Sequence, residues 1–310
     1  MKVLICDKTE ASALDRIRAA GIEVDNRPTI TPEELVRDAA LYDGMVVRSR
    51  TRITSEVIDA AANLKIIVRG GVGLDNIDVK DAQAKGIQVR NTPKASSNSV
   101  AELALGYMLA LARRIPQAAM SMVAGSWLKK ELEGTEVAGK TLGLIGFGNI
   151  GGTLGRKADA LGMAVLFYDV ITPSDPGPAQ QVPLDELLRR SDFISLHVPK
   201  VPATTNMINS ATIAQMKDGV YIINCARGGI VDEDALYDAL ASGKVAGAAL
   251  DVFVDEKVNP GNARLFSLKD RNGLNLVIGS PHIGASTVEG QARVGGEVAD
   301  ILIDFCRQNA

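Results

Sequence analysis

The stretch "TLGLIGFGNIGGTLG", residues 141–155, places closely spaced glycines between an apolar run and a segment with helical spacing. Within it, Gly146, Gly148 and Gly151 form the pattern G-x-G-x-x-G. At a strand-to-helix turn, the first glycine of this pattern permits the turn and the second lets the backbone approach a pyrophosphate. The third glycine allows the helix to pack closely on the strand. The pattern alone also fits a tight turn of no chemical consequence, so the surrounding sequence has to decide.

The residues that follow the glycines favour a dinucleotide. Asp169 ends the next apolar run, roughly 20 residues after the glycines, where a carboxylate binds the ribose hydroxyls of NAD. A helix that begins in the glycine loop also offers free N–H groups to the phosphates. Because Asp169 would repel a ribose 2′-phosphate and residues 170–175 contain no arginine, we expect NAD rather than NADP. The predicted cofactor residues here are Gly146, Gly148, Asn149, Ile150, Gly151 and Asp169.

Short runs rich in Val, Ile and Leu recur along the chain, and each precedes a segment with helical spacing. They form two sets, at residues 2–6, 45–49, 65–69 and 87–91, and at residues 141–146, 164–169, 193–198, 220–224, 246–253 and 275–279. Strands that are apolar on both faces and alternate with helices are typical of parallel sheets covered on both sides. The sequence therefore predicts an α/β protein with two doubly wound parallel-sheet domains.

Two helical segments define the expected domain boundaries. Residues 96–127 are rich in alanine and leucine, and we predict one long helix that bridges the domains. Residues 286–308 form a second long helix, which we expect to pack back on the first domain. A chain of 310 residues suits two domains. We therefore predict a discontinuous substrate-binding domain, residues 1–97 and 283–310, into which a Rossmann NAD-binding domain, residues 98–282, is inserted.

Composition excludes several classes of protein. Lys and Arg number 34 against 37 Asp and Glu, a net charge of -3, so we expect neither nucleic acid nor a membrane surface as partner. Cys6, Cys225 and Cys306 are few and widely spaced, which favours a reducing compartment and argues against a disulfide framework or a metal site. The N-terminus does not resemble a signal peptide, and no apolar stretch approaches the ~20 residues of a membrane span. We therefore expect a cytoplasmic protein.

Polar side chains with chemical potential follow several predicted strands. His197 and His282 come after strands, at the carboxyl ends where open α/β sheets bind ligands. Hydride transfer at a hydroxyl-bearing carbon needs a proton carrier near neutral pH, and imidazole is suited to this role. Arg227 precedes two glycines and could bind a carboxylate with two hydrogen bonds, although surface arginines are often only solvated. Either Asp251 or Glu256 could orient the proton-carrying histidine, or serve only as a capping or surface acid.

Several segments together resemble the D-isomer-specific 2-hydroxyacid dehydrogenase family over nearly the whole chain. They are "VVRSRT" (46–51), "GVGLDNID" (71–78), "GFGNIG" (146–151), "NCARGGIVDEDAL" (224–236), "GAALDVF" (247–253) and "PHIGAS" (281–286). The resemblance implies NAD-dependent oxidation of a D-2-hydroxy acid, a flavodoxin-like substrate domain and a homodimer formed through the NAD-binding domains. Residues 112–134, with several methionines and Trp127, are expected to reach the partner.

The resemblance also implies residue roles. Arg227 matches the residue that holds the carboxylate and carbonyl of the 2-oxo acid, His282 matches the general acid/base, and Glu256 matches the acid that stabilises the protonated histidine. The segments expected to line the cofactor cleft supply His197, Val198, Pro199, Cys225, Ala226, Asp251 and Gly284. The loops expected to bind an anionic substrate between the domains supply Arg48, Ser49, Gly71 and Val72, with Arg50 and Arg69 as further cations for a phosphate.

The substrate is predicted less sharply than the reaction. Residues 134–151 and 224–253 are most similar to family members that oxidise 3-phosphoglycerate, the first step of serine synthesis. A reductase of glyoxylate or hydroxypyruvate, a dehydrogenase of another acidic 2-hydroxy acid, and a corepressor-like protein that senses NAD are the alternatives. Glu256 is followed by Lys257 where the family usually has proline, so this loop is expected to differ. The sequence ends soon after its last helix, so feedback through a C-terminal regulatory domain is not expected.

Overall fold

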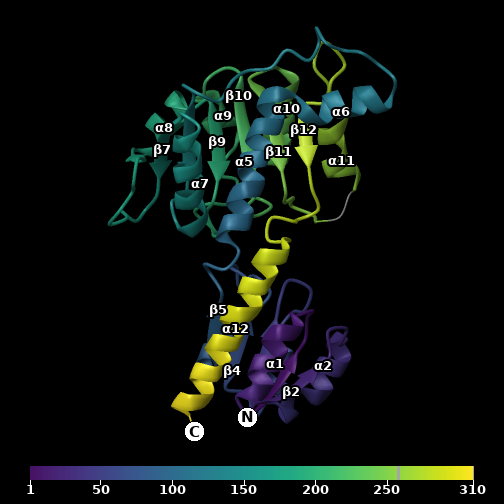
Figure 1. The fold of residues 1–310 in the computed structure, drawn as a ribbon, viewed down its shortest axis with the longest axis vertical. Helices are drawn as coiled ribbons and strands as arrows, with labels where there is room; N and C mark the ends of the chain where they lie inside the picture. The colour runs from purple at the N-terminus through teal and green to yellow at the C-terminus, as the bar shows by residue number, and fades with distance from the viewer. Residues whose placement is uncertain (257–258, 310) are drawn as a thin grey trace. The chain divides into compact units, whose positions relative to one another are not determined.

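The computed structural model describes residues 1–256 and 259–309, and the chain divides into two compact units. Unit 1 comprises residues 1–97 and 285–310, and unit 2 comprises residues 98–284. Each unit contains one sheet of parallel strands with helices on both of its faces (Figure 1). The predicted class, two parallel-sheet α/β domains, is therefore confirmed.

Unit 1 has a five-stranded sheet in the order β2-β1-β3-β4-β5, which is the flavodoxin-like order. The strands are β1 (Lys2–Ile5), β2 (Glu23–Asn26), β3 (Gly44–Val47), β4 (Ile66–Arg69) and β5 (Gln88–Asn91). Helices α1 (Ala11–Ala19) and α12 (Val288–Gln308) lie side by side on one face (Figure 1). The other face carries α2 (Pro32–Asp38), the short 3-10 helix η1 (Ala39–Leu41), α3 (Ser55–Ala60) and α4 (Val79–Ala84).

The central strands of unit 1 are apolar because both of their faces are covered. Val3 and Ile5 pack toward α1 and α12, whereas Leu4 packs toward the opposite helices, as the two-residue period of a strand requires. Strand β2, "EVDN", was not predicted from the sequence. It is an edge strand with exposed or half-buried side chains, so its composition carries no apolar signal.

Unit 2 has a seven-stranded sheet in the order β12-β11-β10-β9-β6-β7-β8. Counted from β6, this is the Rossmann order 3-2-1-4-5-6 with one further strand at the edge. The strands are β6 (Thr141–Ile145), β7 (Ala164–Tyr168), β8 (Gln180–Gln181), β9 (Phe193–Leu196), β10 (Val220–Asn224), β11 (Val245–Leu250) and β12 (Val277–Gly279). Only the two-residue, polar β8 was missing from the predicted set.

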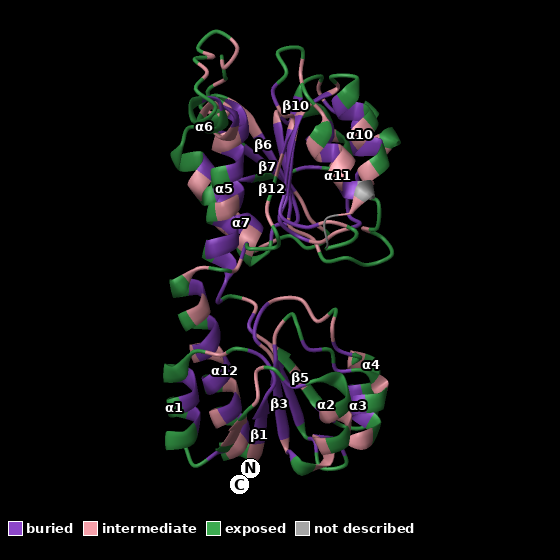
Figure 2. Cartoon of the chain, turned by 90° about the vertical axis from the view of Figure 1, so that its right-hand side faces the viewer, coloured by how far each residue is buried: buried purple, intermediate pink, exposed green. Residues whose placement is uncertain are grey.

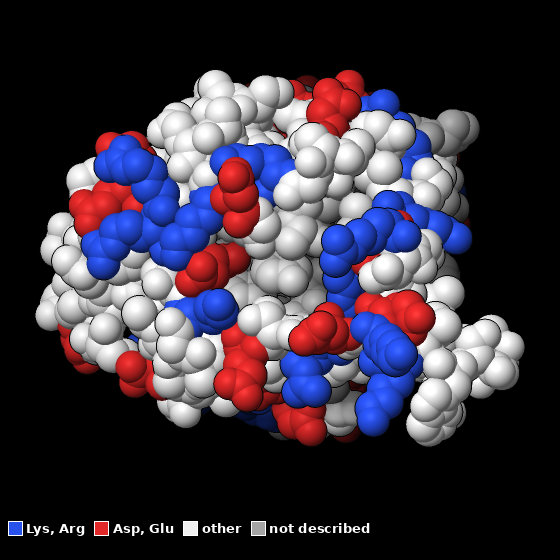
Figure 3. Space-filling model, turned by 90° about the horizontal axis from the view of Figure 1, so that it is seen from above, with Lys and Arg blue, Asp and Glu red and all other residues white. Residues whose placement is uncertain are grey.

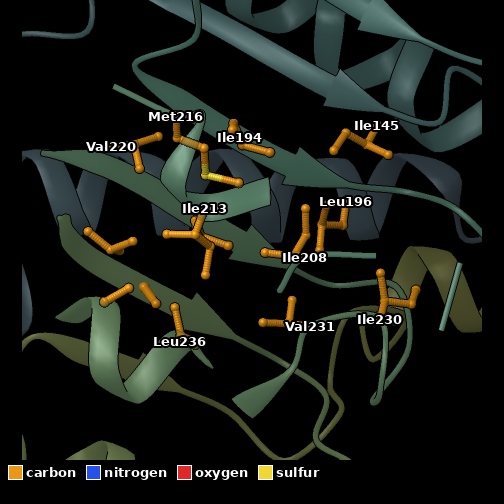
Figure 4. Close-up of a cluster of buried hydrophobic side chains, with 14 of the residues drawn as sticks. Ile145, Ile194, Leu196, Ile208, Ile213, Met216, Val220, Ile230, Val231 and Leu236 are labelled. Atoms are coloured by element: carbon orange, nitrogen blue, oxygen red, sulfur yellow. The ribbon is translucent and has the colours of Figure 1, made fainter. Parts of the chain in front are cut away.

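Helices cover both faces of this sheet, and its strands are buried between them (Figure 2). One face carries α5 (Ser97–Arg113) and α7 (Asn149–Ala160); the other carries α8 (Leu184–Arg190), α9 (Ser210–Ala214), α10 (Glu233–Ala241) and α11 (Pro260–Ser267). Figure 4 shows the apolar core between the sheet and helices α8 to α11, where Ile194 and Leu196 from β9 lie among Ile208, Ile213 and Leu236. The sheet is thus enclosed between two apolar layers, and polar groups are carried by the loops at its strand ends.

The prediction of one helix over residues 96–127 is wrong. Helix α5 ends at Arg113, and α6 (Ile115–Val123) begins after Arg114, whose φ of 52° is left-handed. Pro116 occupies the first turn of α6, a position that proline tolerates; inside a continuous helix its ring would clash with the preceding turn. Arg114 also makes an ion pair with Asp270 at 2.6 Å, which fixes the break.

On the face drawn in Figure 3, Lys and Arg side chains lie among Asp and Glu side chains. Within the described part of the chain, no helix combines the length and apolar character needed to cross a membrane.

Candidate functional site

The glycine loop of unit 2 has three glycines with three different surroundings. A Cβ atom on Gly146, whose φ is +94°, would lie 2.6 Å from the carbonyl oxygen of His197. A Cβ atom on Gly151 would collide with the carbonyl oxygen of Gly146, so α7 approaches β6 closely only because this residue is glycine. A Cβ atom on Gly148 would meet nothing within 4 Å. The first and third glycines are thus required by packing, whereas the second leaves the backbone open to a ligand.

Asp169 lies beside this loop. Its Oδ2 accepts a hydrogen bond from the backbone N–H of Phe147 at 2.6 Å, and its Oδ1 accepts one from Ile171 at 3.0 Å. Two backbone N–H groups therefore fix the orientation of this half-buried carboxylate. Helix α7 starts at Asn149 with Gly148 as its N-cap, which has no side chain to satisfy the first N–H groups. Open backbone, helix N-terminus and fixed carboxylate fit the pyrophosphate and ribose of NAD.

His197 directly follows β9 and lies against the glycine loop. Its Nε2 lies 2.9 Å from the hydroxyl of Ser195, and its Nδ1 is buried with no hydrogen-bond partner among the described residues. Burial lowers the pKa of His197 to about 4, so the imidazole is neutral near pH 7. A group that stays neutral at this pH is poorly suited to exchange protons there. Half-buried Val198 and exposed Pro199 continue the segment.

The turn after β10 presents Arg227. Buried Asn224 shapes it, since its side-chain NH₂ donates to the Arg227 carbonyl and its Oδ1 accepts from the Ala226 N–H, both at 3.0 Å. A Cβ atom on Gly228 would collide with the carbonyl of Phe253, so only glycine lets this turn approach the loop after β11. The Arg227 guanidinium donates to the Ala226 carbonyl at 2.7 Å.

Cys225, which opens this turn, is buried, and burial raises the pKa of its thiol well above the usual range, helped by the nearby Asp251 carboxylate. The thiol is therefore protonated and unreactive under ordinary conditions. Cys225 and the buried Ala226 form an apolar floor beside Arg227.

Asp251, at the end of β11, holds the turn that carries His282. Its carboxylate accepts the backbone N–H groups of Ile283 and Gly284, both at 2.8 Å, and also the hydroxyl of Ser280. The His282 N–H donates to the Asp251 carbonyl at 2.9 Å. His282 has a φ of 55°, a left-handed conformation that costs a non-glycine residue roughly 1–2 kcal/mol. The hydrogen bonds to Asp251 offset the free-energy cost of this backbone conformation.

The side chains of His282 and Glu256 are in direct contact. The ring Nδ1 of His282 lies 2.6 Å from Oε1 of Glu256. Because the carboxylate occupies Nδ1, the ring's Nε2 is the atom that can exchange a proton with a substrate. Of the two acids that the sequence left open, Glu256 contacts the histidine and Asp251 holds the backbone. Lys257, the departure from the family pattern, lies outside the described residues.

The loops of unit 1 place the predicted substrate residues as follows. The guanidinium of Arg48 donates to the side chain of Gln291 in α12, and burial lowers the pKa of Arg48. Arg69 donates to the hydroxyl of Ser49 at 3.2 Å. Gly71 has a φ of +145°, and the Val72 carbonyl accepts from the Asn91 side chain.

Arg50 is engaged within unit 1. Its guanidinium donates to the buried carboxylate of Asp7 at 3.0 Å, to the Ile30 carbonyl at 3.1 Å, and to the Cys6 carbonyl. Two of its nitrogens thus brace the end of β1 and the third binds the segment after β2, which argues against the phosphate-binding role expected for it.

Sequence reasoning missed three residues around the site: Asn224, Ser280 and Tyr107. Asn224 and Ser280 each flank a predicted functional residue at a strand end, which is a usable signal in hindsight. Tyr107 lies within an alanine-rich helix, where nothing in the sequence distinguishes it from a core residue. Its hydroxyl donates to that of Ser280.

Comparison with known proteins identifies the family. Residues 105–284 match the model of the D-isomer specific 2-hydroxyacid dehydrogenase NAD-binding domain. A hydroxypyruvate reductase of Thermotoga maritima is 51% identical over 277 residues, 87% of this chain and 89% of that protein. The D-3-phosphoglycerate dehydrogenase of Homo sapiens is 44% identical over 309 residues, 99% of this chain but 56% of that protein.

Solved structures agree. A D-lactate dehydrogenase from Aquifex aeolicus, complexed with NAD and lactic acid, has a TM-score of 0.86 at 31% identity, over 99% of this chain and 96% of that one. The chain belongs to the D-isomer specific 2-hydroxyacid dehydrogenase family. It is an NAD-dependent dehydrogenase of this family, as the sequence predicted, and NAD is its cofactor.

The role assigned to Asp169 can be tested through cofactor preference. We expect a higher kcat/KM with NAD than with NADP, because a 2′-phosphate would meet this carboxylate. Asp169→Ala should reduce the difference between the two kcat/KM values. It should do so mainly by lowering kcat/KM with NAD, by roughly 10–100-fold, as expected for the loss of hydrogen bonds to a charged group. Steady-state kinetics with both cofactors measure this. Asp175→Ala, which removes an exposed acid from the same loop, is the matched control and should change neither value. Equal kcat/KM for the two cofactors in the unmodified enzyme would refute the assignment.

Proposed function

We propose that the protein interconverts a D-2-hydroxy acid and its 2-oxo acid, with 3-phosphoglycerate as the first candidate substrate. The observation that carries the proposal is the His282–Glu256 pair, 2.6 Å apart, on the same sheet edge as the glycine loop and Arg227. A carboxylate-bound imidazole, a guanidinium and a dinucleotide loop are the groups that this reaction requires.

In the proposed mechanism the residues divide the work. Arg227 binds the substrate carboxylate and aligns C2. His282 accepts the C2 hydroxyl proton at Nε2 during oxidation and returns it during reduction. Glu256 keeps the ring oriented and stabilises its protonated form. NAD, when bound, takes up or supplies the hydride at C2. The residues that would hold it are Gly146, Gly148, Asn149, Ile150, Gly151, Asp169, Val198, Cys225, Ala226 and Gly284.

Reduction of hydroxypyruvate is the second candidate. It is favoured by the relative that is 51% identical and bears the name hydroxypyruvate reductase, because this chain spans 89% of that protein. The phosphoglycerate dehydrogenases match at 43–46% identity, and the chain spans 56–58% of their length. In favour of a phosphorylated substrate, Arg48 and Arg69 supply positive charge in the loops of unit 1.

The acid/base assignment predicts the behaviour of His282→Asn. This variant should lower kcat by roughly 10²–10⁴-fold, the usual contribution of a general acid/base, and leave the NADH Kd nearly unchanged. Glu256→Gln keeps a hydrogen-bonding group but removes the charge, so it should lower kcat less than His282→Asn does. Stopped-flow or steady-state rates together with NADH fluorescence titration measure both effects. Normal activity of His282→Asn would transfer the role to His197.

The substrate proposal predicts a preference for the phosphorylated acid. We expect kcat/KM for 3-phosphohydroxypyruvate to exceed that for hydroxypyruvate by roughly 100-fold or more, since several charge-assisted hydrogen bonds are gained. Arg48→Ala should reduce this ratio, whereas Arg52→Ala, an exposed arginine close by, should not. NADH oxidation with a panel of 2-oxo acids, including glyoxylate, measures it.

Other outcomes of the panel identify the alternatives. Comparable kcat/KM values for the two substrates would favour a hydroxypyruvate or glyoxylate reductase. A preference for another dianionic acid would reject only the phosphate. Binding of NADH without turnover of any 2-oxo acid would favour an NAD-sensing protein.

We further propose a homodimer formed through unit 2. Five large apolar side chains are exposed on α6 and the loop after it: Ile115 (52%), Met120 (62%), Met122 (58%), Val123 (90%) and Trp127 (78%). Neighbouring apolar side chains of this size on a surface mark interaction sites. Their exposure supports the contact with a partner that was expected for residues 112–134.

Light scattering at micromolar concentration should give the mass of a dimer. Val123→Glu should shift the protein toward the monomer, because it places a charge in the apolar contact. Leu41→Glu, at an exposed leucine of unit 1, is the control and should leave the mass unchanged. A monomeric unmodified protein would reject the proposal.

A further inference from the structure

A chain of hydroxyl groups runs from α5 to the turn that carries His282. The buried hydroxyl of Tyr107 donates to Oγ of Ser280, which directly follows β12. The hydroxyl of Ser280 in turn donates to Oδ1 of Asp251, which directly follows β11 and is 1% exposed. Three segments distant in sequence thus contribute one group each to a single hydrogen-bonded path.

The path ends on the backbone of the His282 turn. Through its carboxylate and its carbonyl, Asp251 accepts three consecutive N–H groups, those of His282, Ile283 and Gly284. His282 itself has the left-handed φ of 55°. Such a conformation persists in a non-glycine residue only where its surroundings over-determine it. The orientation of the imidazole toward Glu256 therefore depends on the placement of the Asp251 carboxylate.

The hydroxyl chain has a fixed direction. Oγ of Ser280 accepts a hydrogen bond from the Tyr107 hydroxyl, so the Ser280 hydroxyl donates its own hydrogen bond to Asp251. Burial raises the pKa of Tyr107 to about 12, so its hydroxyl remains a donor throughout the neutral range. A carboxylate buried to this degree needs its oxygens satisfied, and Ser280 supplies the side-chain donor to Oδ1.

We propose that Tyr107 and Ser280 are positioning residues for catalysis: they fix the Asp251 carboxylate and, through it, the His282 turn. The inference rests on the proposed function, which assigns proton transfer to His282. Neither hydroxyl touches the imidazole, so both act only through the turn. The competing explanation is that they merely stabilise the core, in which case removing them lowers the melting temperature and leaves turnover unchanged.

Single-atom variants separate these explanations. Tyr107→Phe should lower kcat by about 3–10-fold, the range expected for one buried hydrogen bond, with the NADH Kd unchanged. Ser280→Ala should lower kcat further, by roughly 10–100-fold, because Asp251 then loses its hydroxyl donor. Ser280→Thr keeps the hydroxyl and should restore activity. Tyr221→Phe, in a partly buried tyrosine of β10 stacked on Phe193, is the matched control and should match the unmodified enzyme.

A double variant tests whether the effect passes through His282. In the His282→Asn background, Tyr107→Phe should cause no further loss of kcat, because the group that it positions is gone. An equal loss in both backgrounds, or a lower melting temperature with unchanged kcat, would overturn the inference. If His282→Asn abolishes turnover and Tyr107→Phe has no effect, only this inference fails. If His282→Asn is fully active, the proton-transfer assignment of the proposed function fails, and this inference with it.

Discussion

The parallel register of the unit 2 sheet is the constraint on which the site depends. Ile145 pairs with both Tyr168 and Leu196, Leu196 pairs with Asn224, and Leu250 pairs with both Asn224 and Gly279. The residues that follow these strand ends therefore lie along one edge. They are Gly146, Asp169, His197, Cys225, Asp251 and Ser280, which are far apart in sequence. Parallel pairing converts a series of strand–loop units into one row of functional groups.

In each unit, a buried aspartate at a strand end holds a neighbouring loop in one conformation. In unit 2, Asp251 accepts the N–H groups of the turn after β12. In unit 1, buried Asp7 accepts the N–H groups of Arg48 and Thr51 and thereby fixes the loop after β3. A carboxylate can accept several N–H groups at once, so one side chain at a strand end orders a neighbouring loop that has no regular structure.

The two histidines show how surroundings, rather than residue type, assign roles. His197 is enclosed under the glycine loop, where burial favours its neutral form. His282 is partly exposed and has a carboxylate at Nδ1, so its charged form has a partner. The same type of side chain is thus a buried structural group at residue 197 and a candidate proton carrier at residue 282.

The sequence by itself determined the fold class, the dinucleotide loop, the cofactor and the family. The fold class, the dinucleotide loop and the cofactor rest on local patterns: apolar runs of strand length, glycines at fixed spacing, and Asp169 at the end of the following strand. The family rests on the resemblance of several motifs along the chain. The polar edge strands β2 and β8 were not predicted, because their position at the edge of a sheet leaves no apolar pattern in their sequence. The break at Arg114 was readable from Pro116, but the apolar helical spacing concealed it.

Only the tertiary structure decided that Arg50 braces β1 and that the hydroxyl of Tyr107 donates to Ser280. The residue types alone left Asp251 and Glu256 open as the partner of His282; the family resemblance implied Glu256, and the structure makes that contact. Each of these outcomes is a hydrogen bond between residues distant along the chain, such as Tyr107 and Ser280. Such contacts follow from sheet register and helix packing acting together. No local pattern records them, because the partners become neighbours only when the sheet has formed.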